Sequence, residues 1–403
     1  MKNTTVIIKL SALLLALALF LIPLCSCGQD VIPLNIPSDN VSHKAKYIPY
    51  GHYIYFSFGW AYRADIREGT YSKACFDPEC NGRCPLDWID MEFCGEENGK
   101  IYFISQNHMD RKEYFAYQDA STGKVTCLAE YSENEVNGSM SSYIANGYWY
   151  YNVMLLKDGG DAMNPDDFVS TICRLSTETG KIETLFELDV KEYMKLAVDE
   201  KVITAMGTTL YAHDVATSET VPLYDIKSIG GTAFGGDISF YNGKYYFGVR
   251  TEEKAESEYR KSTVKLEYLY SLDAQSGECK KINEKPINSF CIANDGIFFV
   301  ETEWRSIYLP DDWENHLDEV IETSMGTKLY CLDYQGEKSA VYESKDLSFP
   351  YDYIVLDGIL YGKMIIPTIV TNEETGDIEV NTIQRFCTID LSTGEVTYCD
   401  KEE

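Results

Sequence analysis

The sequence predicts an all-β protein, a seven-bladed β-propeller, because one phrase recurs along the chain. The phrase is an Asn-Gly turn followed by an aromatic and β-branched run, as in residues 98–103 (NGKIYF) and 242–247 (NGKYYF). Asn-Gly tolerates the positive φ angles of a tight hairpin, and the residues after it favour an extended chain. The copies are marked by Gly51, Gly99, Gly147, Glu200, Gly243, Gly296 and Gly358, at steps of 48, 48, 53, 43, 53 and 62 residues. This period is typical of a propeller, and six or eight blades are also compatible with it.

A second phrase follows the first in most copies and predicts another hairpin. It reads YSLDAQSGE at 270–278, YQDASTGK at 117–124, RLSTETGK at 174–181 and TIDLSTGE at 388–395. Each copy is a short strand, a polar turn with Gly and the start of another strand. Two hairpins give four strands, which form one propeller blade.

The lengths of the connections predict two unlike faces. With the strands of a blade named A to D from the inside out, the short A–B and C–D turns lie on one face, which we call the turn face. The B–C and D–A connections lie on the opposite face, which we call the insertion face. Four long insertions fall there, at residues 156–168, 251–263, 303–327 and 367–382. Variable loops on a rigid repeat scaffold typically mark a binding face; the alternative is that these insertions are only tolerated.

Local patterns predict the form of three insertions. Residues 251–263 favour an extended hairpin or a short helix, and residues 367–382 favour a projecting hairpin. Residues 313–321 favour a helix whose apolar face would contain Trp313, Leu317, Val320 and Ile321.

Strand boundaries can be predicted for the first unit, whereas the fourth unit is the shortest and least typical. The first unit predicts strands at 46–50, 52–58, 61–66 and 71–75. The fourth unit lacks turn glycines, with Glu200-Lys201 and Ser218-Glu219 in their place, which is why a six-bladed count stays open.

The first 26 residues predict a secretory signal peptide, because two Lys precede an apolar run at residues 10–24. The run ends in LCSC at 24–27, which resembles the lipobox of bacterial lipoproteins. In that family the Cys receives a diacylglyceryl thioether and its amine is exposed by cleavage. The resemblance implies Cys27 as the lipid attachment site. Cys25 is an alternative acceptor, and ordinary secretion without a lipid is a further alternative.

These signals divide the chain into three expected parts: a lipoprotein signal peptide (1–26), a lipidated flexible tether (27–45) and the β-propeller (46–403). Each buried CH₂ of an acyl chain such as palmitate contributes roughly 0.8 kcal/mol, so two or three chains on one residue anchor a protein stably. We therefore expect a protein at the cell membrane, on its extracytoplasmic face.

The charge balance restricts the partners. The formal net charge is −29, which disfavours nucleic acid because binding it requires Lys and Arg to displace counterions. Cationic peptides or Ca²⁺ would be attracted; the alternative is that acidity only keeps a surface protein soluble. We expect a monomer that meets the membrane through its lipid and an unknown protein, peptide or glycan on its insertion face.

The most unusual local stretch, CFDPECNGRCPL, carries Cys75, Cys80 and Cys84 and lies in a D–A connection. Three states are open. Two of the Cys residues could form a disulfide, as is expected outside the cell. Thiolates also bind Zn²⁺ tetrahedrally, with a fourth ligand from Cys94, His108 or a loop. The third state is reduced, merely structural thiols.

At this stretch the chain resembles a family of uncharacterised propeller lipoproteins of anaerobic Gram-positive bacteria, similar to the low-density-lipoprotein-receptor-like propeller. The family shows a C-x-D-P-x-C-x-H…C-P-L stretch followed by NG-x-x-Y-F and Y-x-L-D-x-x-T-G phrases. The matching residues of the stretch are Cys75, Asp77, Pro78, Cys80, Cys84, Pro85 and Leu86. Gly82 stands where the family has His, which weakens any metal role taken from the family. The resemblance implies a propeller on a lipid tether and no known activity.

The sequence shows no catalytic motif. Its five His residues are dispersed, and HExxH, GxSxG, a Walker loop and GxGxxG are all missing. We therefore assign no catalytic, cofactor-binding or metal-binding residue, expect no cofactor, and expect a non-enzymatic binding or scaffolding module. The alternative is a propeller enzyme of glycosidase or lyase type acting on extracellular polysaccharide or peptide, with a site assembled near the axis from distant residues.

Overall fold

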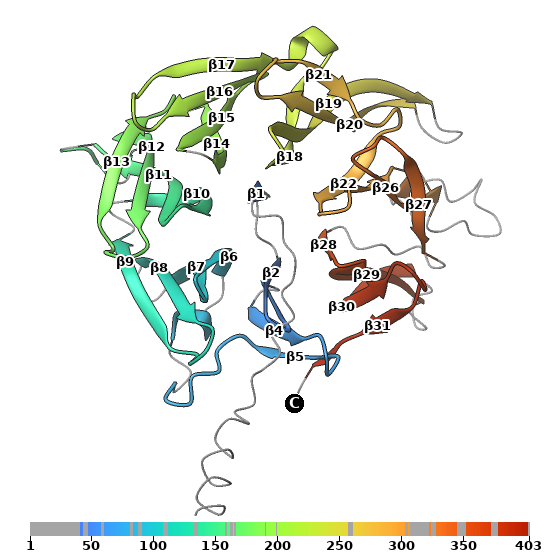
Figure 1. The fold of residues 1–403 in the computed structure, drawn as a ribbon, viewed down its shortest axis with the longest axis horizontal. Coiled ribbons are helices and arrows are strands. Elements are labelled where there is room, and N and C mark those ends of the chain that lie inside the picture. The colour runs from blue at the N-terminus through green and yellow to red at the C-terminus, as the bar shows by residue number, and fades with distance from the viewer. Residues whose placement is uncertain are drawn as a thin grey trace, which may run out of the picture.

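The computed structural model shows seven sheets of four or five strands arranged around one axis (Figure 1). It describes residues 41–42, 47–57, 60–80, 84–87, 91–107, 112–132, 136–157, 159–161, 164, 167–189, 191–198, 200–256, 261–302, 305–306, 322–323, 328–344, 352–371 and 378–401. In every sheet the strands follow one another in chain order. The protein is therefore a seven-bladed β-propeller, as predicted, and the fourth unit is a complete blade.

Blade 1 follows closely the strand boundaries that the sequence predicts. Blade 1 contains β2 (Tyr47–Tyr50), β3 (Tyr53–Ser57), β4 (Ala61–Asp65) and β5 (Thr70–Lys73). Blade 2 contains β6 (Met91–Glu97), β7 (Lys100–Asn107), β8 (Lys112–Asp119) and β9 (Val125–Ser132). Blade 3 contains β10 (Val136–Ala145), β11 (Tyr148–Leu156), β12 (Phe168–Ser176) and β13 (Ile182–Glu187). Blade 4 contains β14 (Glu192–Val198), β15 (Lys201–Met206), β16 (Thr209–Asp214) and β17 (Thr220–Asp225).

Blades 5 and 7 carry the longest strands, of 13 residues each. Blade 5 contains β18 (Ala233–Tyr241), β19 (Lys244–Glu256), β20 (Lys261–Asp273) and β21 (Cys279–Lys281). Blade 6 contains β22 (Ile287–Ile292), β23 (Ile297–Glu301), β26 (Lys328–Leu332) and β27 (Lys338–Glu343). Blade 7 contains β28 (Asp352–Leu356), β29 (Ile359–Thr371), β30 (Ile378–Asp390) and β31 (Val396–Tyr398). The shorter elements are β24 (Arg305–Ser306) paired with β25 (Glu322–Thr323), and the 3-10 helices η2 (Pro85–Asp87) and η4 (Ile226–Ile229).

Six of the seven A–B turns adopt the left-handed conformations that the recurring phrase predicts; the turn at Gly296 in blade 6 does not. Asn98 and Gly99 have φ angles of 55° and 75°, and Asn242 has 49°. Blade 4 makes the same turn without glycine, since Glu200 has φ 56° and, in the C–D turn, Ser218 has φ 59°. Blade 4 therefore holds two non-glycine residues in a backbone conformation that costs each of them roughly 1–2 kcal/mol.

The C–D turns share a cap that explains the Asp of the second phrase. Asp119 Oδ1 accepts the backbone N–H groups of Ser121 (3.0 Å) and Thr122 (2.8 Å). In six blades the corresponding Asp side chain accepts two backbone N–H groups. The six accepting residues are Asp65, Asp119, Asp214, Asp273, Asp333 and Asp390. An Asp side chain that bonds its own backbone stabilises a turn without help from the rest of the fold.

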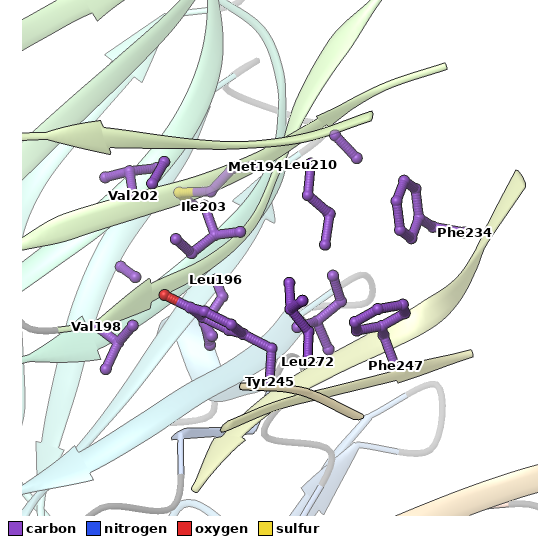
Figure 2. Close-up of a cluster of buried hydrophobic side chains, with 14 of the residues drawn as sticks. Met194, Leu196, Val198, Val202, Ile203, Leu210, Phe234, Tyr245, Phe247 and Leu272 are labelled. Atoms are coloured by element: carbon purple, nitrogen blue, oxygen red, sulfur yellow. The ribbon is translucent and has the colours of Figure 1, made fainter. Parts of the chain in front are cut away.

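The core lies between neighbouring blades. Figure 2 shows Met194, Leu196 and Ile203 of blade 4 facing Phe247 and Leu272 of blade 5, and all five are at most 2% exposed. Burying each such side chain stabilises the fold by roughly 1.5–3 kcal/mol.

Aromatic rings fill other interfaces between blades. The ring of Tyr102 in blade 2 meets Trp149 in blade 3 edge to face, with centroids 5.7 Å apart. Phe56 of blade 1 stacks on Phe386 of blade 7 at 4.5 Å, which joins the first blade to the last. Offset and edge contacts of this kind add about 0.5–1.5 kcal/mol each beyond area burial.

Both ends of the described chain add strands to the ring. All four strands of blade 7 come from the C-terminal part of the chain, as expected, and β32 (Asp400–Lys401) then pairs in parallel with β5 of blade 1. Near the N-terminus, β1 (Val41–Ser42) pairs with the inner strand β18 of blade 5 (Figure 1). Part of the segment that we expected to be a tether therefore contacts the propeller.

The insertion face carries two long hairpins. β19 and β20 stay in register as far as Glu256 opposite Lys261, and β29 and β30 as far as Thr371 opposite Ile378. The two predicted hairpins, at 251–263 and 367–382, are confirmed. The helix predicted at 313–321 lies outside the described residues. Within residues 41–401, in the parts described above, no helix has the length and apolar character needed to cross a bilayer.

Candidate functional site

A cleft of about 270 Å³ opens on the insertion face between blades 5 and 6. It lies at the foot of the long β19–β20 hairpin. Its lining residues come from β19, β20, β22 and the end of β23: Arg250, Lys265, Leu266, Glu267, Ile287, Asn288 and Thr302. The lining thus combines charges of both signs with two aliphatic side chains.

Arg250 and Glu267 face each other across β19 and β20, and Arg250 Nε lies 3.0 Å from Glu267 Oε2. The carboxylate of Glu267 fits because two neighbours are glycines. A Cβ on Gly235 or Gly248 would come within 2.2 or 2.0 Å of Glu267 Oε1. The glycines therefore make room for the carboxylate at this position.

Bulges in the inner strands deliver two further polar groups to this region. The register of the inner strand shifts between Met194 and Leu196 in blade 4 and between Ile287 and Ser289 in blade 6. The extra residues are Lys195 and Asn288. A bulge turns a side chain out of the normal alternation, so each can point away from the apolar interface.

Lys195 joins blade 4 to the inner strand of blade 5. Its side chain is 5% exposed, and Nζ donates to the carbonyl oxygens of Gly235 (2.9 Å) and Gly236 (3.1 Å). On the blade 6 side, Thr302 Oγ1 donates to Asn288 Oδ1 at 2.8 Å. Two polar groups of the cleft lining, Asn288 and Thr302, are thus fixed by a hydrogen bond between them, which favours a preformed site over a flexible one.

The Cys-rich stretch also has a defined geometry. The sulfur atoms of Cys75, Cys80 and Cys84 all lie within 4.8 Å of one another, and Cys84 Sγ lies 3.3 Å from Cys75 Sγ. The hydrogen bond with Cys75, followed by burial, raises the pKa of the Cys84 thiol. The chain thus brings together the three residues that the sequence marked, in the connection between blades 1 and 2.

Blade 4 contains a buried titratable pair that the sequence did not reveal. His213 Nε2 lies 2.8 Å from Glu192 Oε1, and His213 Nδ1 lies 2.9 Å from Thr220 Oγ1. Burial acts to raise the pKa of Glu192, but hydrogen bonds from His213 and Thr204 outweigh it and hold this pKa below its ordinary value. With Thr204 and Thr220, the pair links all four strands of blade 4, and it lies outside the cleft lining, so we interpret it as structural.

Other residues singled out in the sequence take different positions. His52 is packed: it is 8% exposed, and its ring centroid lies 4.0 Å from that of Tyr53. Cys27 and His108 lie outside the described residues. The cleft residues were missed, because no motif links positions 250, 267 and 288; the available signal was their place beside the 251–263 insertion.

No protein-family model matches the chain, and no curated protein matches it. The β-propeller domain of the trilobed protease from Pyrococcus furiosus is similar at 11% identity and a TM-score of 0.46, over 89% of this chain and 95% of that one. Oligogalacturonate lyase from Vibrio parahaemolyticus gives 11% and 0.44, over 75% and 74%. An acylaminoacyl peptidase gives 10% and 0.48, over 87% of this chain and 58% of that one. These are distant likenesses, and we take no activity from them.

Proposed function

We propose that this chain is a lipid-anchored propeller that binds an extracellular protein, peptide or glycan on its insertion face and acts as a non-enzymatic binding or scaffolding module. The proposal rests on one observation: features that only one or two blades possess lie together on the insertion face. The two longest hairpins and the cleft at the foot of one of them all lie there.

The cleft supports a partner with both polar and apolar groups. Lys265 and Arg250 can receive carboxylates, Glu267 can receive a cationic group, and Ile287 can contact an aliphatic one. The net charge of −29 adds a long-range attraction for cationic segments. Such a mixed lining suits a peptide segment or the surface of a protein better than a purely apolar ligand.

The test is a thermal-melt screen of the mature protein, purified from expressing cells in mild detergent, against glycan fragments and short peptides of both charges. A ligand at 100 times its Kd stabilises by about 2.7 kcal/mol, which should raise Tm by several degrees. Each compound that shifts Tm is then incubated with the protein and analysed for products. Binding without turnover supports the proposal, whereas turnover would show that the protein is an enzyme.

Variants on one strand locate the binding site. Arg250→Gln alters the cleft at the insertion-face half of β19, and Lys244→Gln removes an exposed charge at its turn-face end. We expect the first to weaken binding of the compound by tenfold or more, roughly the 1.4 kcal/mol of one charged contact, and the second to leave it unchanged. Equal affinities for both variants would contradict binding in the cleft.

A further inference from the structure

We propose that Cys75, Cys80 and Cys84 together bind one Zn²⁺ ion as thiolate ligands, with water completing the tetrahedron. This site goes beyond the binding role proposed above, and neither depends on the other.

The sulfur atoms of Cys75, Cys80 and Cys84 converge on one point of the connection. All three Sγ atoms lie within 4.8 Å of one another. Two thiolates on a tetrahedral Zn²⁺, with Zn–S of about 2.3 Å, are about 3.8 Å apart. Cys75 Sγ and Cys84 Sγ, at 3.3 Å, are already close to that separation. A disulfide would use two of the sulfurs and would leave the approach of the third unexplained, whereas a metal ion uses all three.

The chain before the cysteine cluster is fixed to the propeller. Ala74, adjacent to Cys75, is fully buried; its N–H donates to Ala61 O at 2.9 Å, and its carbonyl accepts from Gln118 Nε2 at 3.1 Å. Gln118 is itself fully buried and belongs to β8 of the next blade. The first ligand is therefore held by backbone and side-chain bonds from two blades.

The middle of the loop is held by stacking and by a glycine. The guanidinium of Arg63 lies 3.9 Å from the centroid of the Phe76 ring. A Cβ on Gly123 would come within 2.8 Å of the Asp77 nitrogen and of the Phe76 ring, so the loop packs directly on the C–D turn of blade 2. The backbone then turns, with Cys80 N–H donating to Asp77 O at 3.0 Å, and this turn brings the second sulfur back toward the first.

The chain after the cluster is fixed as well. Pro85 O accepts a hydrogen bond from Ser105 Oγ at 2.7 Å, and Leu86 is 2% exposed in the core of blades 1 and 2. Cys84 is therefore anchored by its two following residues. Ligands held in this way lose little conformational entropy on binding an ion, which favours a structural metal site that ties blade 1 to blade 2.

The experiment uses Co²⁺ as a spectroscopic substitute for Zn²⁺. The mature protein is purified, reduced, freed of metal with a chelator under exclusion of oxygen and titrated with Co²⁺ and then with Zn²⁺. We expect a thiolate-to-cobalt charge-transfer band that saturates at about one equivalent and is abolished by one equivalent of Zn²⁺. Cys75→Ser, Cys80→Ser and Cys84→Ser should each weaken Co²⁺ binding by roughly tenfold or more.

Cys127→Ser is the matched control, because Cys127 is an exposed cysteine of β9 outside the cluster; its titration should equal that of the wild type. The wild-type band needs no variant and therefore tests the site even if a Ser variant fails to fold. The absence of a charge-transfer band in the reduced protein would overturn the proposal. So would a protein isolated without zinc and lighter by the two hydrogens of a disulfide.

Discussion

The turn face and the insertion face of this propeller differ in how uniform their connections are from blade to blade. On the turn face six of the seven C–D turns use the same Asp cap, and six of the seven A–B turns contain a residue with positive φ. On the insertion face the B–C connections range from the tight turn between β15 and β16 to hairpin strands of 13 residues. A repeated turn serves the fold in every blade, whereas a feature present in one or two blades is available for function.

The largest effect should come from Gly123, a C–D turn glycine against which the Cys-rich connection between blades 1 and 2 packs. Gly123 has φ +78° and no room for a Cβ beside Asp77 and Phe76, whereas Gly147 has φ +77° and open space. We expect Gly123→Ala to destabilise by about 3 kcal/mol, because a clash adds to the backbone strain, and Gly147→Ala by about 1 kcal/mol. Urea unfolding of the two variants measures the difference, and equal losses would show that the loop does not rest on the turn.

A second prediction separates binding from stability. Replacing residues 365–384, the outer part of the β29–β30 hairpin, by an Asn-Gly turn keeps the Met364–Arg385 pair and shortens the insertion of blade 7 to the length found in blade 4. Because closing a loop depends only weakly on its length, the free energy of unfolding should change by less than about 1 kcal/mol. If the hairpin contacts the partner, the affinity should fall by about tenfold or more. A large loss of stability would make the hairpin a part of the fold instead.

Blade 4 allows a test with opposite signs. Ser218 holds φ +59° in its C–D turn, so Ser218→Gly should stabilise the protein by about 0.5 kcal/mol through relief of strain. In the same turn, Ala216→Gly changes an exposed residue outside the positive-φ set and should destabilise it by a similar amount. Thermal unfolding of both variants is the measurement. Destabilisation by Ser218→Gly would contradict the conformational account of this turn.

The smallest expected effect is a pH dependence of the turn face. Hydrogen bonds from nearby Ser and Thr residues lower the pKa of four turn carboxyls below 3.8, those of Asp119, Asp214, Asp273 and Asp390. A lowered folded-state pKa means that this stabilisation is complete above pH 3.8 and is lost as the pH falls through the folded-state values. Replacing all four by Asn should therefore flatten the loss of stability below pH 3.8, measured by urea unfolding. An unchanged acid dependence would show that other groups cause it.

The sequence was sufficient for the fold because the turn face is locally encoded. Asn98-Gly99 and its relatives specify the hairpins by their own backbone preferences, so the period and the strand order could be predicted. Blade 4 was harder, since Glu200 and Ser218 adopt left-handed conformations that neither residue type favours.

The candidate site could be predicted only in part. The three cysteines lie close together in the sequence, and their convergence was foreseeable. The cleft was not, because Arg250, Glu267 and Asn288 meet through a hairpin and a bulge in neighbouring blades. No local pattern encodes the position of a bulge side chain or the room that Gly235 and Gly248 leave for a carboxylate.

Photo-crosslinking on intact cells tests directly whether a partner binds on the insertion face. A photoreactive amino acid is placed either at Lys265, which lines the cleft, or at Lys244, on the turn face of the same blade; both positions are exposed. We expect a discrete cross-linked product from position 265 and none from position 244. A product from Lys244 alone would place the binding surface on the opposite face and contradict the account.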